Sequence, residues 1–160
     1  MSKKIDTVFV LALITLFAAT SFLLVLIGAK QYNYVTDVMN ENYETRTTSS
    51  YLTEKIRQHD TKDAITIENL EGVPSLKLIT DEEDISYVTY IYFYDDALCE
   101  LVVTENSVFT LSSGQKIIDA KGFEPRFVND SLLCTKITNT KGETFSLYFT
   151  THCGTRKEAQ

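Results

Sequence analysis

The chain has 160 residues, of which 44% are hydrophobic, and its formal net charge is −7. The negative charge lies after the first 30 residues, because residues 31–160 hold 12 Lys and Arg against 21 Asp and Glu, a net charge of about −9. A surface of this sign repels phosphate backbones and anionic lipid headgroups. The composition therefore argues against direct nucleic-acid binding.

The first predicted element is a membrane span over residues 7–29. This run contains no charged residue, and at about 1.5 Å per residue a helix of this length crosses the roughly 30 Å hydrocarbon layer. A cleaved secretory signal has a shorter apolar core of about 7 to 15 residues, so we expect the span to be retained. Thr15 and Ala19 lie four residues apart within it, a spacing of small residues that lets a second helix pack closely.

The charges on either side of the span predict its orientation. Lys3 and Lys4 belong to a short stub of residues 1–6 before the span, whereas Lys30 alone follows it closely. Positive charge favours the cytoplasmic side. We therefore expect a single-pass protein of the cell membrane, embedded in membrane lipid, with a cytoplasmic N-terminus and an extracytoplasmic C-terminal domain.

Residues 30–60 predict an amphipathic stem helix. They contain neither Pro nor Gly, and apolar residues recur at spacings of three or four residues or their multiples, which is typical of one helix face. Because nothing breaks the chain after Ala29, we expect one continuous helix from about Thr7 to Gln58.

The apolar residues of the stem fall into two groups. Val35, Met39 and Tyr43 are candidates for contact with other helices, because they lie where the stem leaves the membrane. Leu52 and Ile56 stand at i and i+4 on the last turns, so we expect them to pack on the domain that follows.

Residues 61–154 predict an antiparallel β domain, and residues 155–160 a flexible tail. Short runs with period-two alternation are typical of strands, and we expect them at residues 65–70, 76–79, 87–94, 98–104, 108–111, 123–128, 132–139 and 144–151. We interpret residues 115–120 as a short helical or irregular crossover. Turn residues separate these runs, so we expect a meander with one face on the stem. The fold class is therefore α+β, with a long N-terminal helix packed on an antiparallel sheet.

Residues that carry catalysis are scarce in this sequence. The two histidines, His59 and His152, are far apart in the chain, and no nucleophile, phosphate-loop or metalloprotease motif is present. We expect His59 to lie at the end of the stem, where a cation complements the helix dipole. We expect the acidic run at residues 81–84 to form a solvated turn and not a calcium loop. We accordingly predict no catalytic residue, no cofactor and no metal site, and therefore a protein that is not an enzyme.

Three cysteines, Cys99, Cys134 and Cys153, are an odd number and form no CxxC pair. With a turn at residues 141–142, Cys134 faces about Phe149 and Cys153 lies several residues beyond, which is too far for a disulfide. We expect free thiols.

The tyrosines Tyr90, Tyr92 and Tyr94 alternate along one predicted strand. Two interpretations are open. The alternation is typical of a half-buried strand that packs on a core, and exposed tyrosines also form recognition surfaces because they give a large contact area at low entropy cost.

The order of a charged stub, a membrane span, an unbroken amphipathic stem and an antiparallel sheet resembles type IV pilins and the pseudopilins of type II secretion. In detail, TSSYLTEKIRQHD (residues 48–60), YIYFYDDALCELVV (residues 90–103) and SGQKIIDAKGFEPRF (residues 113–127) resemble an uncharacterised family of clostridial single-span proteins. The architecture is also similar to minor pseudopilins of competence systems. In pilins a Gly precedes the mature N-terminus and a Glu stands at its fifth position. Here Lys4 precedes Ile5, and Phe9 takes the place of the Glu.

The resemblance implies a non-enzymatic, membrane-anchored minor subunit of a secretion, pilus or uptake assembly. Its expected partners are other pilin-like subunits or a secretion platform. The alternative hypothesis is a membrane-tethered binding or sensor module outside the cell. Neighbouring genes for a secretion ATPase and further pilin-like chains would favour the subunit.

Overall fold

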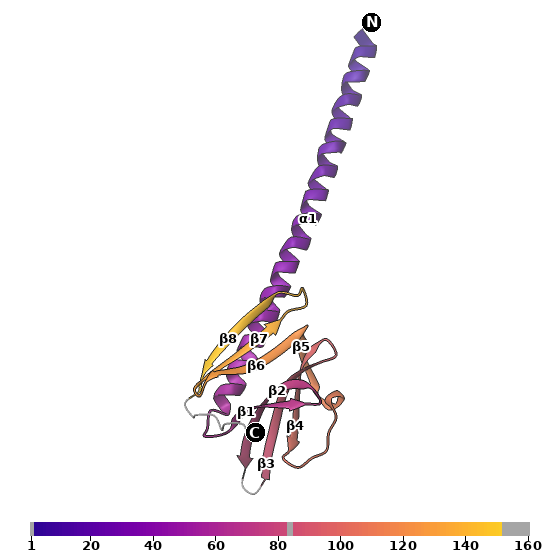
Figure 1. Ribbon diagram of the computed structural model, residues 1–160. Helices are drawn as coiled ribbons and strands as arrows, with labels where there is room; N and C mark the ends of the chain where they lie inside the picture. The colour runs from indigo at the N-terminus through magenta and orange to yellow at the C-terminus, as the bar shows by residue number, and fades with distance from the viewer. Residues whose placement is uncertain (1, 83–84, 152–160) are drawn as a thin grey trace. The chain divides into compact units, whose positions relative to one another are not determined.

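The computed structural model describes residues 2–82 and 85–151, and it has an α+β fold (Figure 1). One long N-terminal helix, α1 (Ser2–Gln58), is followed by eight strands in antiparallel sheets, and the last turns of α1 pack against these sheets. The predicted fold class is confirmed. One continuous helix does end at Gln58, as predicted, but it begins at Ser2 and not at about Thr7. The chain divides into two compact units, Met1–Asn42 and Tyr43–Gln160.

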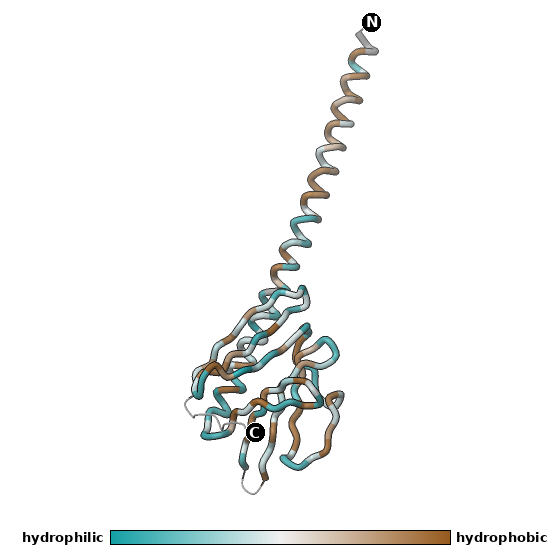
Figure 2. Tube along the Cα trace, in the orientation of Figure 1, coloured by the Kyte–Doolittle hydropathy of each residue, from teal (hydrophilic) through white to brown (hydrophobic). Residues whose placement is uncertain are grey.

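The described residues of the first unit, 2–42, are all helical. Figure 2 shows brown, hydrophobic residues over much of its N-terminal part and more hydrophilic residues after it. This segment of α1 is long and apolar enough to cross a membrane, and no part of it is buried among the described residues. The hydroxyls of Thr15 and Thr20 donate hydrogen bonds to the carbonyl oxygens of Ala12 and Phe17, each at 2.9 Å. Both polar groups are therefore satisfied within the helix, as an apolar surrounding requires.

The second unit contains a five-stranded meander in the order β1-β2-β3-β4-β5. Its strands are β1 (Ile65–Leu70), β2 (Val73–Glu82), β3 (Ile85–Tyr94), β4 (Ala97–Thr104) and β5 (Gln115–Asp119). Two of its hairpins have two-residue turns in the left-handed region, at Glu71-Gly72 and at Asp95-Asp96. Gly and Asp tolerate this conformation better than most residues, which explains why the chain reverses at these points.

The prediction of a single meander is wrong, because the last three strands form a separate sheet. This sheet has the order β6-β7-β8, with β6 (Gly122–Asn129), β7 (Leu132–Thr138) and β8 (Thr144–Thr150). The chain changes sheet within two residues. The Ala120 N–H donates to Asp96 O in the first sheet at 3.1 Å, and the Lys121 N–H donates to Thr138 O in the second at 2.8 Å.

Two smaller predictions are also wrong. Residues 115–120 contain strand β5 and not an irregular crossover, and residues 108–111 form no strand. Instead, residues 105–114 form a loop with one short 3-10 turn, Leu111–Ser113. The predicted tail, residues 155–160, lies outside the described residues.

The first sheet is covered on both faces. On one face, buried residues of α1, of the first sheet and of the second sheet share one core, which includes Leu52, Leu78, Ile91, Phe123 and Leu133. On the other face, the loop at residues 105–114 contributes Leu111 and Phe109 to a second, smaller cluster around Tyr92. The last turns of α1 therefore form part of the main core of the second unit.

Candidate functional site

The residues predicted to anchor the stem lie in the main core. Leu52 is 0% exposed and Ile56 is 3% exposed, and both pack with residues of the two sheets. Fully burying a Leu or Ile side chain contributes about 1.5 to 3 kcal/mol. These two side chains hold the end of α1 on the β domain.

A polar cluster of Tyr51, Lys55 and Glu100 connects the same helix to β4. Lys55 Nζ lies 2.5 Å from Glu100 Oε1, and both side chains are mostly buried. Lys55 Nζ also lies 5.7 Å from the centre of the Tyr51 ring, within the range of a cation–π contact. Burial raises the pKa of the Tyr51 hydroxyl strongly, and the nearby Glu100 carboxylate raises it further. The hydroxyl therefore stays neutral, and the cluster fixes the rotation of the helix on the sheet.

Two further contacts hold the helix near its ends in the second unit. The Thr140 hydroxyl, in the β7–β8 turn, donates to Glu44 Oε1 at 2.9 Å. His59 Nδ1 lies 2.7 Å from the Lys55 carbonyl oxygen, and it must donate because a carbonyl can only accept. His59 therefore caps a free carbonyl of the last turn. His152 lies outside the described residues.

The candidate assembly residues are all exposed. In the first unit, Thr15 and Ala19 lie on the apolar segment, and Val35 and Met39 are 43% and 65% exposed. In the second unit, Tyr43 is 67% exposed. No described residue covers these side chains, so each is accessible to lipid or to another protein.

The three tyrosines of β3 do not form a common exposed surface. Tyr90 and Tyr92 are 6% and 0% exposed, whereas Tyr94 is 37% exposed. The Tyr92 hydroxyl donates to Leu111 O at 2.6 Å and lies so close to Gly114 that a Cβ there would collide with it. Tyr90 and Tyr92 therefore belong to the core, and Tyr94 alone of the three presents a large area to solvent.

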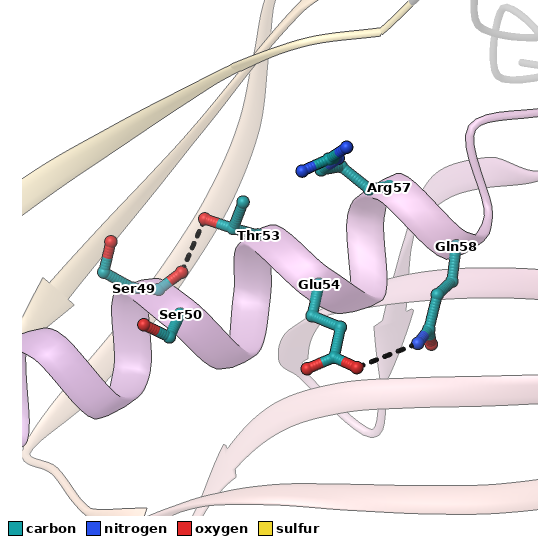
Figure 3. A pocket seen from close by; sticks show the side chains of 6 residues that line it. All are labelled: Ser49, Ser50, Thr53, Glu54, Arg57 and Gln58. Carbon is teal, nitrogen blue, oxygen red and sulfur yellow. Dashed lines mark hydrogen bonds between the residues drawn. The ribbon is translucent and has the colours of Figure 1, made fainter.

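An open groove of about 550 Å³ runs along one side of the last turns of α1 (Figure 3). Its lining residues come from the helix: Ser49, Ser50, Thr53, Glu54, Arg57 and Gln58. Within it, the Thr53 hydroxyl donates to Ser49 O at 2.6 Å, and Gln58 Nε2 donates to Glu54 Oε1 at 3.1 Å. These polar groups bond to one another along the helix and do not converge on a common point.

Metal-binding and redox residues do not gather in the part of the chain that the structure describes. No group of three or more His, Cys, Asp or Glu there is placed to hold a metal ion. Cys99 and Cys134 are buried free thiols, and burial raises the pKa of Cys99. Cys134 pairs with Tyr148, one residue from the predicted Phe149. Cys153 and residues 83–84 of the acidic turn lie outside the described residues.

The sequence did not predict the Tyr51–Lys55–Glu100 cluster. Its signal was present, because Glu100 is a single charge in the otherwise apolar run Ala97–Val103, and an isolated charge in a covered strand needs a partner. The helix offers Lys55, one turn after Leu52 and next to Ile56. Comparing the two segments would have suggested the pair.

A comparison with protein families matches residues 43–140 to one family. The match begins at the first residue of the second unit and extends from the end of α1 through β7. No curated protein and no solved structure matches the chain. The matched residues make up more than half of the sequence, and the chain belongs to the family described as Domain of unknown function (DUF4860).

Proposed function

We propose that this chain is a membrane-anchored, pilin-like minor subunit of a secretion, pilus or uptake assembly, and that it acts by association and not by catalysis. The observation that carries this proposal is the difference in burial between the two parts of α1. Its end is built into the core through Leu52 and Ile56, whereas Val35 and Met39 stay exposed on the polar part of the first unit. A helix that is fixed at one end and leaves apolar side chains uncovered has a surface for other helices.

The apolar segment of α1 is the membrane anchor in this proposal, with the N-terminus inside. Lys30 and the exposed Tyr32 and Tyr34 follow the segment directly, and Tyr and Lys are the residues favoured at the membrane–water boundary. The boundary on the outer side would therefore lie at about residues 30–34. The partners would be other pilin-like subunits or a secretion platform.

External protease tests the orientation. In intact spheroplasts, protease should remove the β domain and leave a small membrane-embedded fragment that is released only with detergent. A control protein with a known outer domain should be cut in the same sample. Full protection of residues beyond Lys30 under these conditions would mean that the orientation is reversed.

Site-directed crosslinking tests the assembly surface. In a Cys153→Ser background, Val35→Cys and Met39→Cys should form crosslinks to other pilin-like chains in intact membranes. Val108→Cys is a matched control, because Val108 is fully exposed on the loop at residues 105–114. If Val108→Cys crosslinks to the same chains as efficiently as Val35→Cys, the contacts are not made by the helix and the proposal fails.

A further inference from the structure

Four strands form the edges of the two sheets, and three of them carry features that discourage pairing with another chain. β1 holds Glu68, β5 holds the ion pair of Lys116 and Asp119, and β6 holds Pro125 between two charged residues. Charges and Pro on an edge are the usual protection against pairing between sheets. β8, with the sequence TFSLYFT, has no charge, no Pro and no Gly.

The backbone of β8 has regularly spaced groups directed away from β7. The Thr151 N–H donates to Ser131 O, and the Asn139 N–H donates to Glu143 O. In an antiparallel ladder, hydrogen-bonded pairs alternate with pairs that are not hydrogen-bonded. Counting from these two bonds, Phe145, Leu147 and Phe149 are the residues of β8 that exchange hydrogen bonds with β7. The N–H and C=O groups of the four residues between them therefore face the open edge: Thr144, Ser146, Tyr148 and Thr150.

The side chains of β8 follow the same alternation. Phe145, Leu147 and Phe149 are half-buried against the main core, and the other four side chains are exposed. The core side of β8 is thus apolar and incompletely covered at the edge. Its outer side is polar and uncharged. A strand laid beside it would bury more of the two phenylalanines.

The sequence of β8 is nearly symmetric about Leu147. Thr144 mirrors Thr150, Phe145 mirrors Phe149, and Ser146 mirrors Tyr148. A two-fold axis through Leu147 sets two antiparallel copies in register, with Thr opposite Thr, Phe opposite Phe and Leu opposite Leu. In this register Thr144 lies opposite Thr150, and Ser146 lies opposite Tyr148. These are the residues whose backbone N–H and C=O groups face the open edge, so the two copies can form hydrogen bonds at these pairs.

We propose that β8 is a self-association edge, at which a second copy of this chain pairs antiparallel through its own β8. The two three-stranded sheets then become one six-stranded sheet in the order β6-β7-β8-β8-β7-β6. Aromatic and aliphatic pairs across such strands are stabilising, and no like charges face each other. The interface lies on the second unit and is independent of the proposed pilin-like role.

The sample for the test is the full-length chain in detergent micelles. The apolar segment of α1 is long and apolar enough to cross a membrane, and micelles keep it in solution without holding two copies in one bilayer.

The test is the oligomeric state of the full-length chain, measured by sedimentation velocity over a range of concentrations. The wild type should form dimers. Ser146→Pro removes an N–H at the open edge without removing a bond to β7, and Ser146→Lys/Tyr148→Lys places Lys opposite Lys. Each should raise the dissociation constant by about tenfold or more. Far-UV circular dichroism checks that the fold is retained.

The matched control is Ser146→Lys/Tyr148→Glu, which places Lys opposite Glu at the same two positions and should keep the dimer. A monomeric wild type would overturn the proposal, and so would a dimer that tolerates Lys opposite Lys as well as it tolerates Lys opposite Glu. Loss of the dimer in both double variants would overturn the two-fold register. If Ser146→Pro unfolds, the comparison of the two double variants decides.

Discussion

Replacing Ile56 with Asp is expected to unfold the β domain. Ile56 is 3% exposed in a core shared by α1 and both sheets. Truncation to Ala should cost about 2 to 5 kcal/mol of the free energy of unfolding, and Asp adds the cost of burying a carboxylate without a partner. Because single domains are stable by only about 5 to 15 kcal/mol, the Asp variant should be largely unfolded at room temperature.

The measurement is a urea titration of a soluble fragment that starts near Asn40, followed by circular dichroism. Arg57→Ala is the matched control, because Arg57 is the next residue on the same turn and its side chain is exposed. It should change the stability by no more than about 0.5 kcal/mol. An unchanged urea midpoint for Ile56→Asp would mean that the end of α1 does not hold the β domain together.

The parts of the fold that sequence predicts well are those in which each residue carries a local signal. Short runs of mostly apolar and aromatic residues define β3 and β4, and the Asp95-Asp96 turn between them needs a conformation that Asp tolerates. β5 was missed because its sequence, QKIID, is short and charged. It becomes a strand by pairing with β4, and a pairing partner elsewhere in the chain leaves no local pattern.

The division into two sheets also depends on pairing between distant residues, which leaves no local sequence pattern. The change of sheet depends on two backbone bonds, from Ala120 to Asp96 and from Lys121 to Thr138. Each joins residues that are distant in sequence, and backbone groups are alike in every residue. The alternation and turn signals therefore predicted the strands β6, β7 and β8 but not that they leave the first sheet.

In the candidate site, too, the residues with a local sequence signal were predictable, and the contacts between distant residues were not. Leu52 and Ile56 were predictable because they are apolar at i and i+4 on a polar helix end, and they lie in the core. The bond from Thr140 to Glu44 joins residues 96 positions apart, and neither residue is unusual in its own segment. The choice between a tyrosine surface and a tyrosine core also needed the structure, because the loop at residues 105–114 covers Tyr90 and Tyr92.

Exchanging the apolar segment is the second change with a large expected effect. In one strain, residues 1–29 are replaced by an unrelated single span of the same length and orientation, so that the β domain remains tethered. In another, a cleavable signal exports residues 31–160 without any anchor. If the chain acts by packing its helix against related helices, both strains should lose the function of the native protein, because helix packing depends on particular small and apolar side chains.

The comparison of the two strains separates the two hypotheses for function. A tethered binding module needs its sheet at the membrane surface and places no demand on the sequence of the span, so the unrelated span should restore function. An assembly subunit needs Thr15, Ala19 and the other residues of its own helix, so tethering alone is insufficient. Immunoblotting and protease resistance of the β domain in each strain confirm that it is present and folded. Restored function with the unrelated span would reject the assembly hypothesis and favour the binding module.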